Sequence, residues 1–133
     1  MTHFRTVTDT FSVSPQISLD DVAAAAAQGF TLVINNRPDG ESPDQPTSAQ
    51  IEAAAKAAGL DYLYAPVMGR PGPAQVEAVR EAVAAASGKT LAYCRSGTRS
   101  IYTWALGQAS AVDPDTLLRQ GAAAGYDLSP VVG

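Results

Sequence analysis

Short apolar stretches alternate with longer alanine-rich segments along this chain, and this alternation constrains the fold more than any other feature. Stretches rich in β-branched and aromatic residues predict strands over residues 11–13, 30–35, 62–67 and 90–93. The segments that follow carry apolar residues at helical spacing, and they begin at helix-capping residues such as Ser18. Because strands that alternate with helices pair in parallel, the order predicts an α/β fold: a mostly parallel sheet of four to five strands flanked by helices.

Five helices are expected between and after these strands. Three of them start near Ser18, near Thr47 or Ser48, and at Pro73, and they stop at Gly29, Gly59 and Gly88. Two more are predicted over residues 100–109 and from Pro114 to near Gly125. The connections are short and no interior linker stands out, so we expect one catalytic domain over residues 1–133.

Charge and hydropathy limit the kinds of molecule that this chain is expected to bind. The 133 residues include 9 basic and 13 acidic side chains, a net charge of -4, and no basic tract stands out. This balance argues against nucleic-acid binding. No apolar run is long enough to span a bilayer, and no secretory leader is recognisable at the N-terminus. We therefore expect no membrane partner and a cytoplasmic location.

The chain has one cysteine, Cys94, and one histidine, His3. A lone cysteine cannot form an internal disulfide, and it cannot build a zinc cluster with a single histidine near the terminus. We expect neither a metal ion nor a cofactor.

Cys94 directly follows the predicted strand 90–93 and opens a polar loop that leads into a helix. In open α/β sheets, ligands bind beyond the carboxyl ends of the strands. The N–H groups of a tight strand-to-helix loop form an anion cradle, and the helix N-terminus adds partial positive charge. Such surroundings favour a reactive thiolate. A buried structural cysteine is the alternative, but the loop is too polar for a core segment.

The loop supplies the candidate site residues. Cys94 is the candidate nucleophile, and Arg99 is the candidate catalytic arginine. The other residues expected to bind an anion here are Arg95, Ser96, Gly97, Thr98 and Ser100. Gly97 permits a backbone conformation that a side chain would disfavour.

A second polar loop follows the predicted strand 30–35, which makes it a neighbour of the first if the strands are parallel. We expect Asn36 and Arg37 to line the site, with Arg37 binding the anion. Asp39 or Glu41 is a possible acid, although Pro-Asp-Gly is also an ordinary turn signal. Arg70, on a third loop, is by default a solvated surface side chain.

Two resemblances arise at these residues. The segment 93–100, YCRSGTRS, resembles the active-site loop of rhodanese-type sulfurtransferases, and it is similar to a cysteine-phosphatase loop shortened by one residue. Together with segments 11–17, 29–41, 45–46 and 65–67, it resembles the phosphatase-like domain of the beta-lactamase-hydrolase-like proteins. That resemblance covers nearly the whole chain and implies a cysteine-phosphatase-like fold. It also implies sulfur transfer where the domain is fused to a persulfide-dioxygenase-like domain.

The residues favour sulfur transfer over phosphate hydrolysis. A phosphatase needs an acid for its leaving group, and related phosphatases carry it on the loop that here spans residues 67–73 and has no Asp or Glu. Tyr93 also replaces the usual histidine before the cysteine, and the loop that is one residue shorter forms a smaller cradle, which suits a persulfide better than a phosphate monoester. A rhodanese-like enzyme would form a Cys94 persulfide and pass the sulfur to cyanide, a thiol or a protein acceptor. Two alternatives stay open: a phosphatase acting through a Cys94 phospho-enzyme, and a non-catalytic module that binds anions or persulfides.

Overall fold

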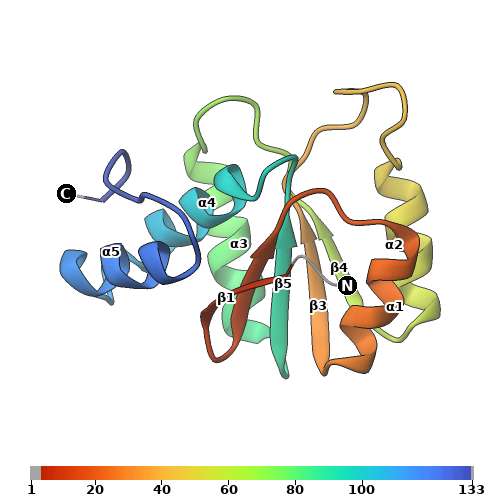
Figure 1. Cartoon of the computed structure of the whole chain (residues 1–133), viewed down its shortest axis with the longest axis horizontal. Coiled ribbons are helices and arrows are strands. Elements are labelled where there is room, and N and C mark those ends of the chain that lie inside the picture. Colours follow the sequence, from red (N-terminus) through yellow and green to blue (C-terminus); the bar gives the residue numbers. More distant parts are fainter. Residues whose placement is uncertain (1–3, 133) are drawn as a thin grey trace.

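The computed structural model describes residues 4–132 and has a five-stranded sheet between two layers of helices (Figure 1). The strands are β1 (Arg5–Thr8), β2 (Phe11–Ser14), β3 (Phe30–Asn35), β4 (Asp61–Tyr64) and β5 (Lys89–Tyr93). They lie in the order β1-β2-β5-β3-β4, and β1 alone runs antiparallel to its neighbour. The expected mostly parallel α/β sheet is therefore confirmed.

Five helices cover the sheet: α1 (Leu19–Ala27), α2 (Ser48–Ala57), α3 (Pro73–Ala85), α4 (Thr98–Gln108) and α5 (Pro114–Ala123). Helices α1 and α2 cover one face, and α3 and α4 cover the other, with α5 outside α4 (Figure 1). Ser18 and Thr47 each form a capping box with the residue three positions later, which satisfies backbone N–H groups of the first turn. Within the described residues, no helix is long and apolar enough to cross a membrane.

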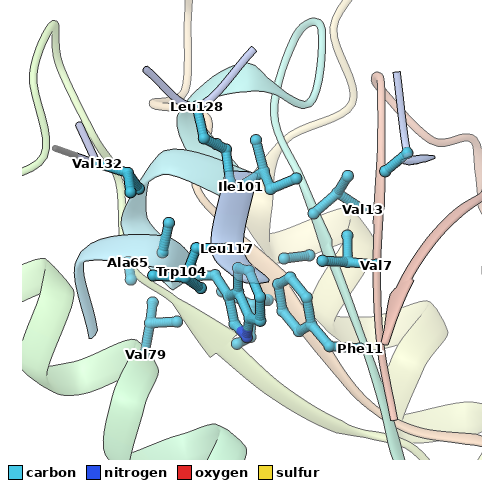
Figure 2. Close-up of a cluster of buried hydrophobic side chains, with 14 of the residues drawn as sticks. Val7, Phe11, Val13, Ala65, Val79, Ile101, Trp104, Leu117, Leu128 and Val132 are labelled. Atoms are coloured by element: carbon cyan, nitrogen blue, oxygen red, sulfur yellow. The ribbon is translucent and has the colours of Figure 1, made fainter. Parts of the chain in front are cut away.

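The sheet has a separate hydrophobic core on each face because successive strand residues point to opposite sides. Val33 and Leu91 pack toward α1 and α2. On the other face, the ring of Phe11 stacks on Trp104 of α4, with 5.2 Å between ring centroids (Figure 2). Trp104 was expected in the core from its helical spacing, and it is 4% exposed.

Two strands differ from the sequence expectation by more than one residue at an end. Strand β1 was not predicted, because a four-residue edge strand with a single buried side chain has almost no alternation to detect. Strand β4 ends at Tyr64, three residues earlier than expected, although Ala65 and Val67 still donate backbone hydrogen bonds to Asn35 and Asn36. The segment after β4 thus stays attached to the sheet edge without regular strand geometry.

The carboxyl ends of the four parallel strands meet at one end of the sheet, the upper end in Figure 1. The loops after β2, β3, β4 and β5 gather there, and each leads into a helix. This end of the molecule therefore brings together the polar loops that the sequence places far apart.

Candidate active site

Cys94 is the first residue after β5, and its side chain is completely buried. Its backbone N–H donates to the carbonyl of Ser14 across 3.4 Å, which extends the β2–β5 pairing to the start of the loop. The sulfur Sγ accepts a hydrogen bond from the backbone N–H of Gly97 at 3.1 Å. The buried sulfur is therefore held by a main-chain donor of the loop that follows it.

Gly97 is the N-cap of α4 and has a φ angle of 92°. This left-handed conformation is readily available only to glycine, and it turns the chain from the loop into the helix. The turn places the N-terminus of α4 directly after the nucleophile. The partial positive charge of a helix N-terminus stabilises an anion at this point.

Arg99 lies in the first turn of α4 and reaches back across the loop. Its Nη1 donates to the carbonyl of Val67 at 2.8 Å and to Oε2 of Glu41 at 2.8 Å, while Nη2 donates to Oε1 of Glu41 at 2.8 Å. The hydrogen bonds to Glu41, and the nearby sulfur of Cys94, raise the pKa of Arg99. The Nε edge of the guanidinium donates to no oxygen of the described residues, so it remains available for an oxyanion.

Glu41 also binds a second guanidinium. Arg37 donates from Nε to Oε1 of Glu41 at 3.0 Å and from Nη1 to the side-chain oxygen of Gln16 at 3.0 Å. The hydrogen bond from Arg99, reinforced by the one from Arg37, lowers the pKa of Glu41 to about 2. Glu41 is therefore ionised at neutral pH and cannot serve as a proton donor in this arrangement, which removes it as a candidate acid.

The remaining loop residues differ in how they face the site. Arg95 and Ser96 are exposed, and the Ser96 hydroxyl donates to the hydroxyl of Thr98 at 3.0 Å. Ser100 is completely buried, and its hydroxyl has no hydrogen-bond partner within the described residues. A buried hydroxyl without a partner, next to Arg99, can donate to a bound anion or to the sulfur.

Asn36 contributes mainly through its backbone. Its N–H donates to the carbonyl of Tyr93 at 2.9 Å, its carbonyl accepts from Val67 at 2.9 Å, and its side-chain amide donates to the carbonyl of Ala65 at 2.9 Å. Asn36 thus ties the end of β5 to the segment after β4. It holds the walls of the site together, while Arg37 is the residue of this pair that reaches the charged network.

Asp39 lies on the wall of a neighbouring cavity of about 560 Å³. The cavity is also lined by Pro38, Tyr64, Val67, Met68 and Arg70. Asp39 accepts a hydrogen bond from the backbone N–H of Ser48 at 2.7 Å, and its own N–H donates to the Tyr64 hydroxyl at 2.9 Å. Val67 connects this cavity to the arginine, because the residue lines the cavity and its carbonyl accepts a hydrogen bond from Arg99. Arg70 faces the same cavity.

Sequence reasoning missed two contributors, Gln16 and Tyr126. Gln16 positions Arg37, and the Tyr126 hydroxyl donates to the carbonyl of Ser96 at 2.8 Å. No local pattern marks either residue, since each acts on a loop distant in the sequence. His3 lies outside the described residues, and within residues 4–132 no cluster of three or more His, Cys, Asp or Glu side chains is placed to hold a metal ion.

Residues 3–111 match the family described as the phosphatase-like domain of the beta-lactamase hydrolase-like protein. The chain belongs to this family. A beta-lactamase hydrolase-like protein of Agrobacterium fabrum is 38% identical over 104 residues, which are 77% of this chain and 24% of that protein. The chain therefore spans about a quarter of the length of that curated relative. The family match ends before α5 and Tyr126.

Solved structures place the fold among the cysteine phosphatases. A candidate phosphatase from Neisseria meningitidis superposes with a TM-score of 0.85 and 31% identity, covering 98% of this chain and 94% of that one. The kinase associated phosphatase, solved with its catalytic-site cysteine replaced by serine, has a TM-score of 0.67 at 14% identity, covering 93% of this chain and 85% of that one. The second likeness concerns the fold alone. The expected cysteine-phosphatase-like architecture is confirmed.

The prediction of rhodanese-like sulfur transfer is wrong. The family is described as phosphatase-like, and the Neisseria meningitidis neighbour is described as a candidate phosphatase; neither supports a Cys94 persulfide or a thiol acceptor. The prediction gave too much weight to the short loop and to the missing acid in residues 67–73. In the folded chain another carboxylate, Asp39, faces the cavity beside Arg99, so the absence of an acid from that one loop does not exclude phosphate chemistry.

Proposed function

We propose that this chain is a cysteine-dependent phosphatase that hydrolyses phosphate monoesters through a phospho-enzyme on Cys94. The observation that carries the proposal is a main-chain donor on the Cys94 sulfur, together with a guanidinium that starts in the first turn of the helix directly after the loop. The N–H of Gly97 lies 3.1 Å from Sγ, and Arg99 extends from the same helix start with its Nε edge free. Donors fixed in this way stabilise the equatorial oxygens of a phosphoryl group in transfer.

The proposed reaction has two displacements at phosphorus. The Cys94 thiolate attacks, the S–P bond forms, and the P–O bond to the leaving group breaks while the leaving oxygen takes a proton from an acid. Water then attacks the phosphocysteine and returns a proton to the same group. The S–P bond breaks, inorganic phosphate leaves, and the thiolate is regenerated. No electrons change hands, and water is the only co-reactant.

Asp39 is the proposed acid. It is the one carboxylate among the residues that line the cavity beside Arg99. One of its oxygens is engaged by Ser48, and the other has no hydrogen-bond partner within the described residues. The anchored oxygen orients the carboxyl group, and the second oxygen is free to hold the transferred proton.

The cavity is the proposed site for the leaving group. Its wall combines the ring of Tyr64, two prolines and Met68, which is 81% exposed. Apolar and aromatic walls of this kind favour an organic group over water as the occupant of the cavity. The substrate is therefore proposed to be a small anionic molecule with an organic group esterified to phosphate.

The reaction needs a reducing environment, because a reactive thiolate is otherwise oxidised. We propose that the domain works in the cytoplasm for this reason. The single-domain organisation over residues 1–133 remains a prediction of the sequence.

Steady-state hydrolysis of p-nitrophenyl phosphate tests the proposal. Cys94→Ser is expected to abolish turnover. Arg99→Lys is expected to lower kcat/KM by about 100-fold or more, because a lysine lacks the planar guanidinium that donates two parallel hydrogen bonds to an oxyanion. The matched control is Arg119→Lys on the exposed face of α5, which should retain activity. A purified chain that binds orthovanadate but hydrolyses no phosphate ester would instead be the non-catalytic binding module.

The role of Asp39 has its own test. Asp39→Asn is expected to slow hydrolysis of an alkyl phosphate, whose leaving group needs a proton, about 100-fold. The same variant should slow p-nitrophenyl phosphate much less, because nitrophenolate leaves without protonation. Equal losses with both substrates would show that Asp39 supports the loop rather than the leaving group.

A further inference from the structure

One peptide group in the catalytic loop is held at both of its ends. The carbonyl of Ser96 accepts a hydrogen bond from the hydroxyl of Tyr126 at 2.8 Å. The N–H of the same peptide group belongs to Gly97 and donates to Cys94 Sγ at 3.1 Å. Because a trans peptide is planar, its C=O and N–H point in opposite directions. Fixing the carbonyl toward Tyr126 therefore aims the N–H at the sulfur.

Tyr126 is packed tightly against this peptide. A Cβ atom added at Gly97 would overlap the Tyr126 hydroxyl oxygen, so the phenol occupies the space that any side chain at Gly97 would need. The ring is held from outside by Arg5 of β1, whose guanidinium carbon lies 5.2 Å from the ring centroid. The backbone N–H of Tyr126 is anchored to the carbonyl of Gly121 at 2.9 Å.

We propose that Tyr126 is a positioning residue that locks the Ser96–Gly97 peptide with its N–H directed at the Cys94 sulfur. The role in catalysis rests on the proposed phosphatase function, whereas the effect on the sulfur does not. Tyr126 lies outside residues 3–111, the part of the chain that matches the family. The segment after α5 therefore supplies a support for the catalytic loop from beyond the matched region.

The restraint from Tyr126 is needed because Gly97 lacks a side chain that would restrict its backbone. A glycine peptide can rotate to an alternative orientation at little cost, and a rotated peptide would present its carbonyl oxygen to the thiolate. The hydrogen bond from Tyr126 stabilises the productive orientation. It also polarises the peptide, which strengthens the opposite N–H as a donor to a negatively charged sulfur.

The test compares Tyr126→Phe with Tyr102→Phe in the full chain. The first variant removes only the hydroxyl that binds Ser96. Tyr102 is the matched control, because its hydroxyl donates at 3.5 Å to the carbonyl of Asp127, the next residue along the same segment, and does not touch the loop. Circular dichroism melting confirms that both variants are folded at the assay temperature.

The first readout is the rate of Cys94 alkylation by iodoacetamide as a function of pH. Tyr126→Phe is expected to raise the midpoint by about half a pH unit or more, because the thiolate loses an oriented donor. The second readout is orthovanadate affinity, expected to fall about fivefold, the size of one net hydrogen bond. Tyr102→Phe should leave both unchanged.

Unchanged alkylation and vanadate binding in folded Tyr126→Phe would overturn the proposal, as would equal shifts in both variants. Neither readout requires turnover. If the native chain hydrolyses no phosphate ester but Tyr126→Phe still shifts the alkylation midpoint, the phosphatase function fails while the lock on the peptide stands.

Discussion

Glu41 joins two guanidinium groups that would otherwise repel each other. It receives Arg99 through a two-bond fork and Arg37 through a third hydrogen bond, all at 2.8–3.0 Å. Its side chain is 30% exposed, so water screens the pairs only in part. The carboxylate therefore sets both the position of Arg99 and the net charge of the anion site.

Glu41→Gln should change the pH dependence of stability. The folded-state pKa of Glu41 is about 2, below the value of about 4.3 usual in an unfolded chain. The stabilisation that ionised Glu41 gives the folded state is therefore fully present above about pH 4.3, and it is lost as the pH falls toward 2. The free energy of unfolding of the wild type should exceed that of Glu41→Gln by about 1–2 kcal/mol at pH 7, after allowance for screening by water. The difference should be smaller at pH 3. Urea unfolding at both pH values measures the gap.

Glu52→Gln is the control for that experiment. Glu52 is an exposed carboxylate of α2 that makes no ion pair within the described residues. Its replacement should have little effect at either pH. A wild-type advantage over Glu41→Gln that stays constant from pH 7 to pH 3 would contradict the assignment of the low pKa.

At the residue scale, the sequence predicts the cysteine loop and the approach of the loop after residues 30–35, but not the contacts between their side chains. Cys94, Gly97 and Arg99 form one contiguous motif whose backbone chemistry is readable without a structure. Glu41 lies 58 residues before Arg99 in the sequence, and its binding to both arginines depends on strands β3 and β5 being neighbours. Tyr126 acts from a segment with no recognisable pattern. Residues of this kind become visible only when the loops are placed in space.

Helix α4 serves the site with its first turn and the core with its middle. Arg99 and the N-cap Gly97 form the anion site, whereas Ile101, Trp104 and Ala105 face the sheet. Figure 2 shows Trp104 and Phe11 side by side within this core. The packing of the helix thereby fixes the position of the loop that precedes it.

Trp104→Ala should destabilise the domain by about 3–5 kcal/mol, because the indole is nearly fully buried and leaves a large cavity. Trp104→Phe retains an aromatic partner for Phe11 and should cost clearly less. Urea unfolding followed by far-UV circular dichroism measures both changes. Equal losses in the two variants would show that the stack with Phe11 is not the important contact.

At the element scale, helices were easier to predict than strands. Capping residues and terminal glycines mark the ends of α1 and α2 within a few residues. Strand β1 was missed and β4 was predicted too long, because pairing with a neighbour decides whether a short extended segment is a strand. The strand order was not predicted, since nothing in the sequence states which strands are adjacent.

The whole molecule has two cores that share one sheet. One core lies under α1 and α2, and the other lies under α3, α4 and α5 and includes Leu117, Leu128 and Val132 from the C-terminal part. Strands β3 and β5 contribute side chains to both. A destabilising substitution in either core therefore affects the same two strands, so we expect the stabilities of the two helical layers to be coupled.

The isolated chain should unfold in one cooperative step, although it spans about a quarter of the length of a curated relative. Far-UV circular dichroism reports both layers, whereas the fluorescence of the only tryptophan, Trp104, reports one. The two urea transitions should coincide. A fluorescence transition that precedes the loss of helix signal would show that the layers unfold separately and that the single-domain prediction is wrong.

In the proposed reaction, Cys94 carries the phosphoryl group during turnover. Rapid acid quenching of the enzyme with p-nitrophenyl phosphate, followed by peptide mass spectrometry, tests this claim directly. We expect one phosphoryl group on the peptide that contains Cys94 and none on the same peptide of Cys94→Ser. Hydrolysis without any phosphoryl adduct on that peptide, or hydrolysis that survives in Cys94→Ser, would contradict it.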